Sequence, residues 1–265
     1  MLEVKNMLKT FFKGTVNEKT ALQGVDLKLE EGDFVTVIGG NGAGKSTLLN
    51  SVAGVFPIDE GQILINDVDV TKMPEYKRAK YIGRVFQDPM VGTAGNMQIE
   101  ENLLLALRRG KRLGLKWAFV PEERQFFKER LSLLGLGLED RLTARMGLLS
   151  GGQRQSITLL MATMLKPELL LLDEHTAALD PRTAENVLQL TDKLVTEHNL
   201  TTLMITHNMR DALRFGNRLI MMDAGRIIFD VKGEEKKQMT VQDLLKRFEV
   251  AGENALSDRM ILAKN

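Results

Sequence analysis

The chain has 265 residues, 43% of them hydrophobic, which is enough for a sizeable core. Because this length exceeds the roughly 100–200 residues of a typical domain, we expect one large domain or a core with a subdomain. Its 36 basic and 35 acidic residues leave a net charge of +1, only 5% of its residues are aromatic and it has no cysteine, so the composition disfavours a nucleic-acid partner and excludes disulfides and thiolate metal sites.

The sequence also lacks the apolar segments that secretion and membrane insertion require. The first residues, MLEVKNMLK, do not contain the roughly 7–15 apolar residues of a signal peptide. No window approaches the roughly 18 uninterrupted apolar residues of a membrane span. We therefore expect neither a leader nor a spanning helix, and any membrane role requires a partner.

The N-terminal region has strand-like alternation. Residues 2–8 alternate weakly, and Val25, Leu27 and Leu29 alternate with polar residues, which predicts two strands. Between them, KTFFKG places Phe11 and Phe12 in a polar connection. Such rings are more often core packing, but their place upstream of a glycine-rich loop leaves open that one of them stacks on a nucleotide base.

That loop lies in FVTVIGGNGAGKST, residues 34–47. Its first five residues predict a strand, and the glycines that follow lead into a helix that opens at Lys45 and ends at Gly54. The spacing fits a phosphate-binding loop, whose glycines let backbone N–H groups approach a phosphate chain at the positive end of the helix dipole. We expect Lys45 to contact the β- and γ-phosphates and the Ser46 hydroxyl to bind Mg²⁺. The other residues expected around the phosphates are Gly39, Gly40, Asn41, Gly42, Ala43, Gly44 and Thr47.

Two further strands are predicted at residues 62–66 and 81–86. The second stops before Pro89, because proline disfavours helix at the residue that precedes it. Gln87 therefore lies at a strand end, where an α/β sheet presents ligand-binding loops. Alone, it is equally a solvated loop residue.

Residues 99–149 change to a helical pattern, with helices predicted over 99–107 and 124–134. A basic run separates them, and it is either a solvated face or a contact for a partner or lipid head groups. This run consists of Arg108, Arg109, Lys111 and Arg112. We interpret residues 88–165, approximately, as a helical subdomain inserted into a sheet-based core.

The segment LSGGQ, residues 149–153, precedes a helix predicted over 154–165. Ser150 and Gln153 have the spacing of a capping box. Gly151 and Gly152 in the first turn cost up to about 1 kcal/mol each against alanine. Close approach of the backbone to an anion at this helix N-terminus would explain them.

The run LLLL at residues 169–172 predicts a strand buried on both faces of a parallel sheet. Asp173 and Glu174 follow directly, and carboxylates are seldom buried without a partner. Beside a phosphate loop, the fitting roles are Mg²⁺ coordination for Asp173 and water activation for Glu174.

The C-terminal part predicts a helix that starts with Asp180 as N-cap, then a strand over 201–205 that ends before His207. A single histidine there is as often structural as catalytic. A short helix over 209–215, strands over 218–222 and 226–229 and an amphipathic helix over 241–248 complete the pattern.

Taken in order, these motifs resemble the ATP-binding subunit of an ABC (ATP-binding cassette) transporter over residues 1–240. The matching segments are GGNGAGKST, Gln87, LSGGQ, LLLLDE, ALD at 178–180 and His207. The resemblance implies an α/β fold: a P-loop NTPase core with a parallel central sheet, an N-terminal antiparallel β subdomain and the inserted helical subdomain. Residues 241–265 would be a short C-terminal helical extension.

The resemblance also implies residue roles. Phe11 resembles the aromatic residue that stacks on adenine, with Phe12 as the alternative. Gln87 matches the glutamine that contacts Mg²⁺ and the attacking water and links the site to the membrane partner, while Glu174 matches the catalytic carboxylate and His207 the sensor of the γ-phosphate. The implied catalytic residues are Glu174, His207, Gln87 and Lys45, and the implied Mg²⁺ ligands are Ser46, Gln87 and Asp173. The implied ATP contacts beyond the phosphate loop are Phe11, Gln87 and Asp180 and, toward the ATP of a second copy in a head-to-tail dimer, Ser150, Gly151, Gly152 and Gln153.

By this resemblance the chain hydrolyses ATP with Mg²⁺ at the cytoplasmic face of a membrane and drives separate transmembrane permease subunits. Importer subunits fit best, including an amino-acid system of the tryptophan/tyrosine type with an extracytoplasmic solute-binding protein. The alternative is a soluble, non-transport ABC ATPase of iron–sulfur assembly or translation. A binding module with a dead site is disfavoured, because Lys45, Glu174 and His207 are intact.

The sequence departs from the family at one position, where His175 replaces the usual proline after the catalytic glutamate. A fixed φ is lost and a titratable ring gained. We expect unchanged chemistry with altered pH dependence.

Overall fold

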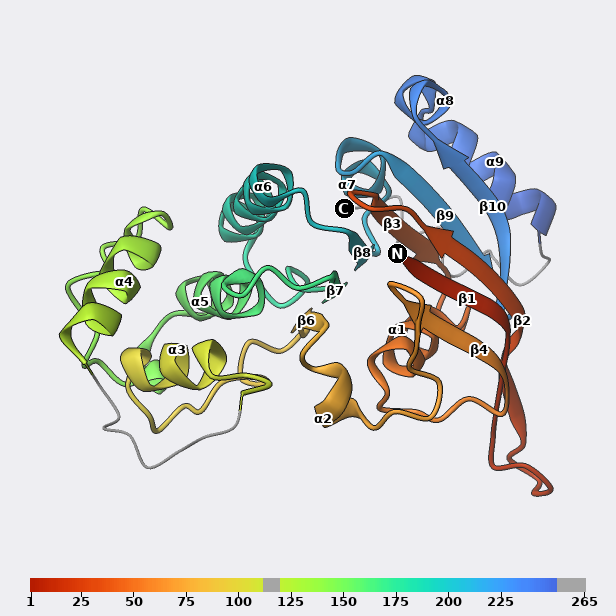
Figure 1. Cartoon of the computed structure of the whole chain (residues 1–265). Coiled ribbons are helices and arrows are strands. Elements are labelled where there is room, and N and C mark those ends of the chain that lie inside the picture. The colour runs from red at the N-terminus through yellow and green to blue at the C-terminus, as the bar shows by residue number, and fades with distance from the viewer. Residues whose placement is uncertain (112–119, 252–265) are drawn as a thin grey trace.

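Two sheets organise the chain in the computed structural model, which describes residues 1–111 and 120–251 (Figure 1). The smaller, four-stranded sheet is antiparallel and has the order β2-β1-β4-β5. Its strands are β1 (Leu2–Phe11), β2 (Lys19–Leu29), β4 (Glu60–Ile65) and β5 (Val68–Asp69). This sheet is the N-terminal antiparallel part that the family resemblance implied.

The larger sheet has six strands in the order β10-β9-β3-β8-β7-β6. Its strands are β3 (Phe34–Gly39), β6 (Ile82–Val85), β7 (Leu169–Asp173), β8 (Thr202–Ile205), β9 (Arg218–Asp223) and β10 (Arg226–Lys232). All neighbours pair in parallel except β9 and β10, which form an antiparallel hairpin. The carboxyl ends of β3, β6, β7 and β8 therefore meet at one edge, where α/β sheets present ligand-binding loops.

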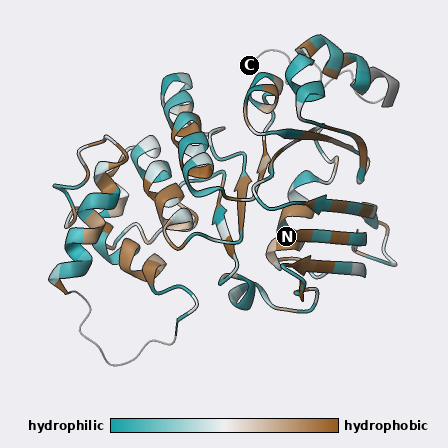
Figure 2. Ribbon diagram, turned by 45° about the horizontal axis from the view of Figure 1, so that its top comes forward, coloured by the Kyte–Doolittle hydropathy of each residue, from teal (hydrophilic) through white to brown (hydrophobic). Residues whose placement is uncertain are grey.

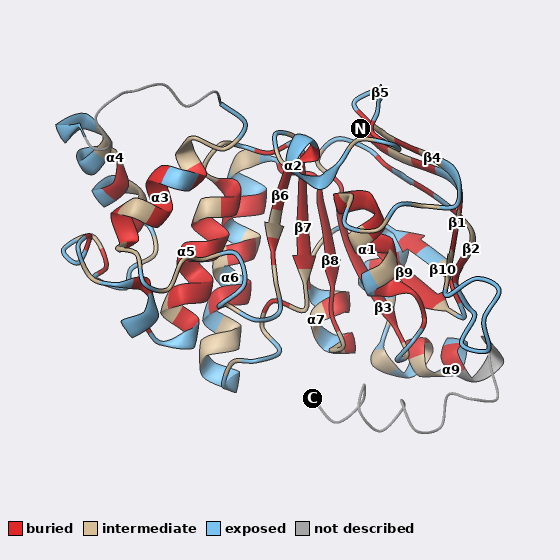
Figure 3. Ribbon diagram, turned by 90° about the horizontal axis from the view of Figure 1, so that it is seen from below, coloured by how far each residue is buried: buried red, intermediate tan, exposed pale blue. Residues whose placement is uncertain are grey.

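Helix α1 (Lys45–Ala53) lies between the two sheets. Its Leu48, Leu49 and Val52 pack into a core that receives Leu2 from the small sheet and Leu203 from the large one. Strands β3 and β8 are buried along their whole length (red in Figure 3), as expected for strands covered on both faces. This packing fixes the start of α1, and with it the phosphate loop.

The opposite face of the large sheet is covered by helices from the second half of the chain. Leu159 and Leu188 pack against Leu170, Leu172 and Met204 of the sheet. The helices concerned are α5 (Gly151–Thr163) and α6 (Pro181–His198), and α7 (Met209–Arg214), α8 (Glu234–Gln238) and α9 (Val241–Ala251) lie near β9 and β10.

A separate helical region extends from the sheet on the side of β6 (Figure 1). It contains α3 (Ile99–Leu107), α4 (Pro121–Ser132) and η1 (Met146–Leu148), packed on α5, and α2 (Glu75–Arg78) precedes β6. Its core includes Ile99, Phe127, Leu131 and Ile157. Figure 2 shows the hydrophobic strands at the centre of the molecule and the largely hydrophilic α4 at its edge. None of the helices within the described ranges combines the length and hydropathy that crossing a membrane requires.

The structure confirms the predicted fold class, with one addition: the central sheet ends in the antiparallel strand β10. The first strand does not stop at Leu8 but runs to Phe11, because Phe11 pairs with Lys19 of β2. The helix expected from residue 154 starts at Gly151, since the Ser150–Gln153 capping box closes its first turn. Arg112 and residues 252–265 lie outside the described residues, and the limits of the helical subdomain at about 88 and 165 stay a prediction.

Candidate functional site

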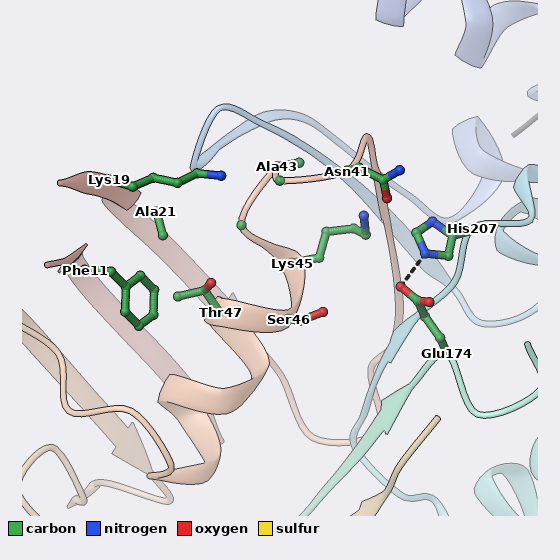
Figure 4. Close-up of a pocket in the computed structure, with 12 residues that line it drawn as sticks. Phe11, Lys19, Ala21, Asn41, Ala43, Lys45, Ser46, Thr47, Glu174 and His207 are labelled. Carbon is green, nitrogen blue, oxygen red and sulfur yellow. Dashed lines mark ion pairs between the residues drawn. The ribbon is translucent and has the colours of Figure 1, made fainter. Parts of the chain in front are cut away.

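A pocket opens where the carboxyl edge of the central sheet meets the N-terminus of α1 (Figure 4). Strands β1 and β2, the loop after β3, the start of α1 and the ends of β7 and β8 all contribute to it. Its lining residues are Phe11, Lys19, Ala21, Asn41, Gly42, Ala43, Gly44, Lys45, Ser46, Thr47, Glu174 and His207. The fold thus brings together residues from four widely separated parts of the sequence.

The loop between β3 and α1 requires glycine for steric reasons. Gly44 is the N-cap of α1 with φ 100°, a conformation that side chains disfavour, and a Cβ there would lie 2.6 Å from the carbonyl oxygen of Ala21. As a glycine, Gly44 has no side chain with which to cap α1. Because the first N–H groups of a helix have no intrahelical acceptor, the start of α1 suits an anion held in the pocket.

Lys45 supplies the positive charge at this end of the pocket. Its side chain is 5% exposed, and Nζ donates hydrogen bonds to the carbonyl oxygens of Gly39 at 2.8 Å and Gly40 at 3.0 Å. These contacts hold the ammonium group inside the curve of the loop. Figure 4 shows it between Asn41 and His207, facing the same space as Glu174.

Glu174 and His207 come from the ends of neighbouring strands and meet across the pocket. Nε2 of His207 lies 2.5 Å from Oε1 of Glu174 (dashed line in Figure 4). The backbone of Glu174 has φ 46°, the left-handed conformation that is rare for a side chain of this size, and its N–H donates to the carbonyl oxygen of Ile205 at 3.1 Å. The turn after β7 is therefore tied to β8.

Asp173, the last residue of β7, is largely enclosed. Burial raises the pKa of its carboxyl, the neighbouring Glu174 raises it further, and electrostatic interactions with Arg84, Lys45 and His207 oppose these effects. Nη2 of Arg84 lies 3.9 Å from Oδ2 of Asp173. A divalent cation next to this carboxyl would favour its ionised form.

Several predicted site residues lie outside this pocket. Gln87 is exposed in the turn after β6, and Asp180 is the N-cap of α6, where its side chain accepts a hydrogen bond from the Thr183 N–H at 3.1 Å. Hydrogen bonding by the Thr183 side chain, and then by its backbone N–H, lowers the pKa of the Asp180 carboxyl. Ser150 and Gly151 are exposed at the start of α5. Of the predicted site residues, this pocket is lined by Phe11, residues 41–47, Glu174 and His207, but not by Gly39, Gly40, Gln87, Asp173, Asp180 or residues 150–153.

The structure explains why position 152 is a glycine, and the explanation differs from the one that the sequence suggested. A Cβ on Gly152 would lie 2.1 Å from Cγ2 of Thr183, because α5 and α6 approach closely at this point. Packing of α5 against α6 therefore requires glycine at position 152, whether or not an anion binds there. At Gly151 an added Cβ would lie 3.2 Å from Leu179 Cδ2, a tight contact with a flexible side chain.

The geometry also distinguishes Phe11 from Phe12. Phe11 ends β1, lines the pocket and stacks edge-to-face on Phe56 with the ring centroids 5.2 Å apart. Phe12 is 69% exposed, has φ 53° and is not among the lining residues of this pocket. The ring available to a nucleotide base in the pocket is that of Phe11.

Sequence reasoning missed Lys19 and Ala21, which line the pocket from β2. Lys19 pairs with Phe11 across the β1–β2 ladder, and its Nζ lies 3.4 Å from the place of a Cβ on Gly42. Lys19 does not belong to any of the sequence motifs described above. Only the strand register, which the sequence left open, could have indicated it.

His175 does not add a titratable group to the pocket. Its ring is buried against α6, where Nε2 lies 3.0 Å from Oγ1 of Thr191, and burial lowers the pKa of the imidazole to about 4. The ring is therefore neutral at physiological pH. The expectation that it alters the pH dependence of catalysis is not supported near neutral pH.

Comparison with known proteins adds to this geometry. Residues 22–177 match the family model described as ABC transporter. A tyrosine transport ATP-binding protein of Clostridioides difficile is 45% identical, over 95% of this chain and 100% of that protein. The methionine import ATP-binding protein MetN 2 of Enterococcus faecalis is 33% identical, over 94% of this chain and 70% of that protein.

Solved structures show the same architecture. The dimeric structure of a post-hydrolysis state of the ATP-binding cassette MJ0796, bound to ADP and Pi, matches with a TM-score of 0.75 and 31% identity. The match covers 88% of this chain and 98% of the other.

Proposed function

Because the chain belongs to the ABC transporter family as an ATP-hydrolysing subunit of an import system, we propose that the pocket beside α1 is its ATP site and that the solute is an aromatic amino acid. The observation that carries the site assignment is the convergence of Lys45, Glu174 and His207 on one pocket at the phosphate loop. The 45% identity to a tyrosine transport protein along its whole length supports the solute.

In the proposed binding mode the nucleotide lies along the pocket from Phe11 to Glu174. Adenine stacks on the Phe11 ring, whose contact with Phe56 holds it in place. The phosphates follow the loop, where the N–H groups of Gly42, Gly44 and the first turn of α1 point at them. Lys45 exchanges its contacts with the loop carbonyls for the terminal phosphates.

The residues at the phosphate end fit Mg²⁺. Ser46 lines the pocket and Asp173 directly precedes Glu174, so they offer a hydroxyl and a carboxylate oxygen to Mg²⁺, which prefers oxygen ligands. The amide oxygen of Gln87 would join them only after the turn that follows β6 moves toward the pocket. Within residues 1–111 and 120–251, no group of three or more histidine, cysteine, aspartate or glutamate side chains could hold a metal alone. Phosphate oxygens would complete the coordination, as is usual for this ion. When bound, Mg²⁺ neutralises charge on the phosphates.

We assign hydrolysis to the paired side chains at the strand ends. Glu174 accepts a proton from the attacking water, and His207, in contact with Oε1, orients the carboxylate and reaches the γ-phosphate. Gln87 joins this group only if the turn after β6 moves toward the pocket, because it lies outside the lining in this structure.

The second half of the site comes from another copy of the chain. Ser150 and Gly151 are exposed at the start of α5, away from the pocket of their own chain. We propose that residues 150–153 and Asp180 complete the ATP site of a partner in a head-to-tail dimer. The MJ0796 cassette, which is similar in fold and sequence, forms a dimer.

As a transport ATPase subunit, the chain works with membrane permease subunits. We propose that it lies at the cytoplasmic face of the membrane and that an extracytoplasmic solute-binding protein delivers the solute. Exposed apolar side chains would contact the permease: Met90 at 53% and Val91 at 46% exposure, which follow Gln87 in the chain, and Leu148 of η1 at 75%. The soluble, non-transport alternative finds no support among the relatives named above, which are transport proteins.

Isolation of the Glu174→Gln protein with ATP from detergent-solubilised native membranes tests this function. We expect a polytopic permease to co-purify and tyrosine or a related amino acid to stimulate wild-type ATP hydrolysis when permease and solute-binding protein are present. Co-purification of ribosomal or iron–sulfur assembly proteins without a permease would overturn the transport role. Stimulation by methionine rather than by aromatic amino acids would overturn the solute alone.

A further inference from the structure

Gln155 is a fully buried side chain on α5 that the motifs above do not include. Its exposed fraction is 0%, and its Nε2 donates two hydrogen bonds to backbone carbonyl oxygens. One goes to Phe86 at 3.0 Å and the other to His175 at 2.7 Å. These acceptors lie 69 and 20 residues away in the sequence, so one amide group joins three distant segments.

Each acceptor is the backbone neighbour of a residue placed in the ATP site. Phe86 precedes Gln87, and His175 follows Glu174. The parallel ladder between β6 and β7 ends at the pair Val85–Leu172, so strand pairing no longer holds Phe86 against the chain beyond Asp173. Beyond the end of this ladder, the two hydrogen bonds of Gln155 connect Phe86 to His175.

The turn that Gln155 holds is strained. Glu174 has φ 46°, and such a conformation persists only where the surroundings determine it. The Glu174 N–H bond to Ile205 fixes one side of the turn, and the Gln155 bond to the His175 carbonyl fixes the other. The direction of the Glu174 carboxylate therefore depends on both.

Gln155 also lies two residues beyond Gln153, in the helix whose first turn faces the partner's ATP in the proposed dimer. Oε1 of Gln155 is buried without a hydrogen-bond partner in the described part of the chain. A buried acceptor of this kind lowers stability. Because the unpaired Oε1 opposes folding, the two hydrogen bonds donated by Nε2 are the reason we assign for a buried glutamine at position 155.

We propose that Gln155 is a positioning residue for ATP hydrolysis: its amide anchors Phe86, where the Gln87 turn begins, and His175, which follows Glu174, to α5. This inference rests on the proposed function, since it assigns a task within the same ATP site.

Steady-state kinetics of Gln155→Met and Gln155→Asn test the proposal. Methionine keeps the volume but has no donor, and asparagine keeps both donors but is one methylene too short to span the two carbonyls. We expect kcat to fall by about tenfold or more in both variants while KM for ATP stays within about twofold, because small displacements of catalytic groups cost turnover rather than binding.

Thr163→Val is the matched control. Thr163 is also buried on α5, but its hydroxyl donates to Leu159 of the same helix at 2.9 Å and bridges nothing. We expect this variant to lose thermal stability without loss of kcat. Equal losses of kcat in Thr163→Val and Gln155→Met would overturn the positioning role.

Hydrogen exchange gives a readout apart from turnover. In Gln155→Met we expect faster amide exchange in peptides covering residues 86–90 and 174–179, with unchanged exchange in β3 and β8. Unchanged exchange in both peptides, or unchanged kcat in a folded Gln155→Met protein, would overturn the proposal. If Gln155→Met does not fold, Gln155→Asn decides the matter by the same two measurements.

The same assays distinguish the positioning role of Gln155 from the proposed ATP site on which that role depends. A wild-type protein that hydrolyses ATP, and a Glu174→Gln protein that does not, establish the site independently of Gln155. Failure of either result would overturn the proposed site, whereas normal turnover in both Gln155 variants would overturn the positioning role alone.

Discussion

Nε2 of His207 lies 2.5 Å from Oε1 of Glu174, although the two residues are separated by a complete helix and strand. The contact follows from sheet register. Asp173 pairs with Ile205 in the β7–β8 ladder, so the residues that follow leave the sheet side by side. A rigid sheet, and not a loop, sets the distance between the two side chains on which we place hydrolysis.

Replacement of Glu174 by glutamine tests the role of the carboxylate. The amide has the same shape but cannot accept a proton, so we expect ATP hydrolysis to fall by about a hundredfold or more. ATP binding should remain, and ATP should trap the dimer, which size-exclusion chromatography would detect. Glu197→Gln, a half-exposed position on α6, is the control and should hydrolyse ATP normally. Near-wild-type turnover in Glu174→Gln would remove this residue from catalysis.

Lys19 offers a second prediction, since its ammonium group lies above the loop near Gly42. We expect Lys19→Gln to weaken binding of ATP and ADP alike, by about twofold to tenfold, because an exposed charge contributes modestly to phosphate binding. The loss should shrink at high salt, where exposed charges are screened. Titration with a fluorescent nucleotide at two salt concentrations would measure both effects.

Lys28→Gln provides the matched control for Lys19. It removes the same charge from the same strand, but Lys28 lies at the other end of β2, outside the pocket. An equal loss of affinity in the two variants would show that only net charge matters. A loss for ATP without a loss for ADP would place Lys19 near the terminal phosphate instead.

The parts of the site that the sequence predicted are those in which local chemistry determines position. The spacing from Gly39 to Ser46 fixes a loop at a helix start, and Asp180 and Ser150 cap the helices that follow them. Long elements such as the helix over 99–107 were also predicted, because their apolar residues repeat with helical period.

The parts that the sequence did not predict depend on contacts between distant residues. The end of β1 at Phe11 depends on pairing with Lys19, and the need for Gly152 depends on Thr183 in another helix. Short elements such as β5 and α2 have too few residues for a periodic pattern. Burial of the His175 side chain depends on a space between α5 and α6 that exists only in the folded chain.

The contact between Gly152 and Thr183 leads to a third prediction. We expect Gly152→Ala to lower the free energy of unfolding by about 1–3 kcal/mol, because the new methyl group overlaps Thr183 Cγ2 in a packed helix interface. Thr183→Ser removes that methyl group, so the double variant should recover most of the loss. Urea unfolding of both single variants and the double variant would measure the coupling.

This cycle also separates packing from ligand contact at Gly152. If the double variant recovers stability and ATP hydrolysis together, packing within the chain is the reason for glycine. If stability returns but hydrolysis does not, the position also needs close approach to the partner's nucleotide. Unchanged stability in Gly152→Ala would contradict the packing explanation.

His175 gives a prediction about pH. Its pKa is lowered to about 4 in the folded chain, from a reference value of 6.5, because the buried ring cannot be solvated when charged. Between these two values the unfolded chain binds a proton that the folded chain does not. The free energy of unfolding therefore falls as pH drops from about 6.5 to about 4, by up to about 3 kcal/mol from this group, and above pH 6.5 the contribution is constant.

Comparison of the wild type with His175→Gln isolates this group from the carboxylates that titrate in the same range. Glutamine can still donate a hydrogen bond to Thr191 but does not titrate, so its stability should fall less between pH 6.5 and 4 than that of the wild type. His198→Gln, on the partly exposed end of α6, is the control for loss of a histidine that is not buried. Because the His175 ring is neutral above pH 7, the pH–rate profiles of ATP hydrolysis for wild type and His175→Gln should coincide there. A profile that differs between the two proteins at pH 7–8 would mean that His175 acts on Glu174 directly, contrary to its buried contact with α6.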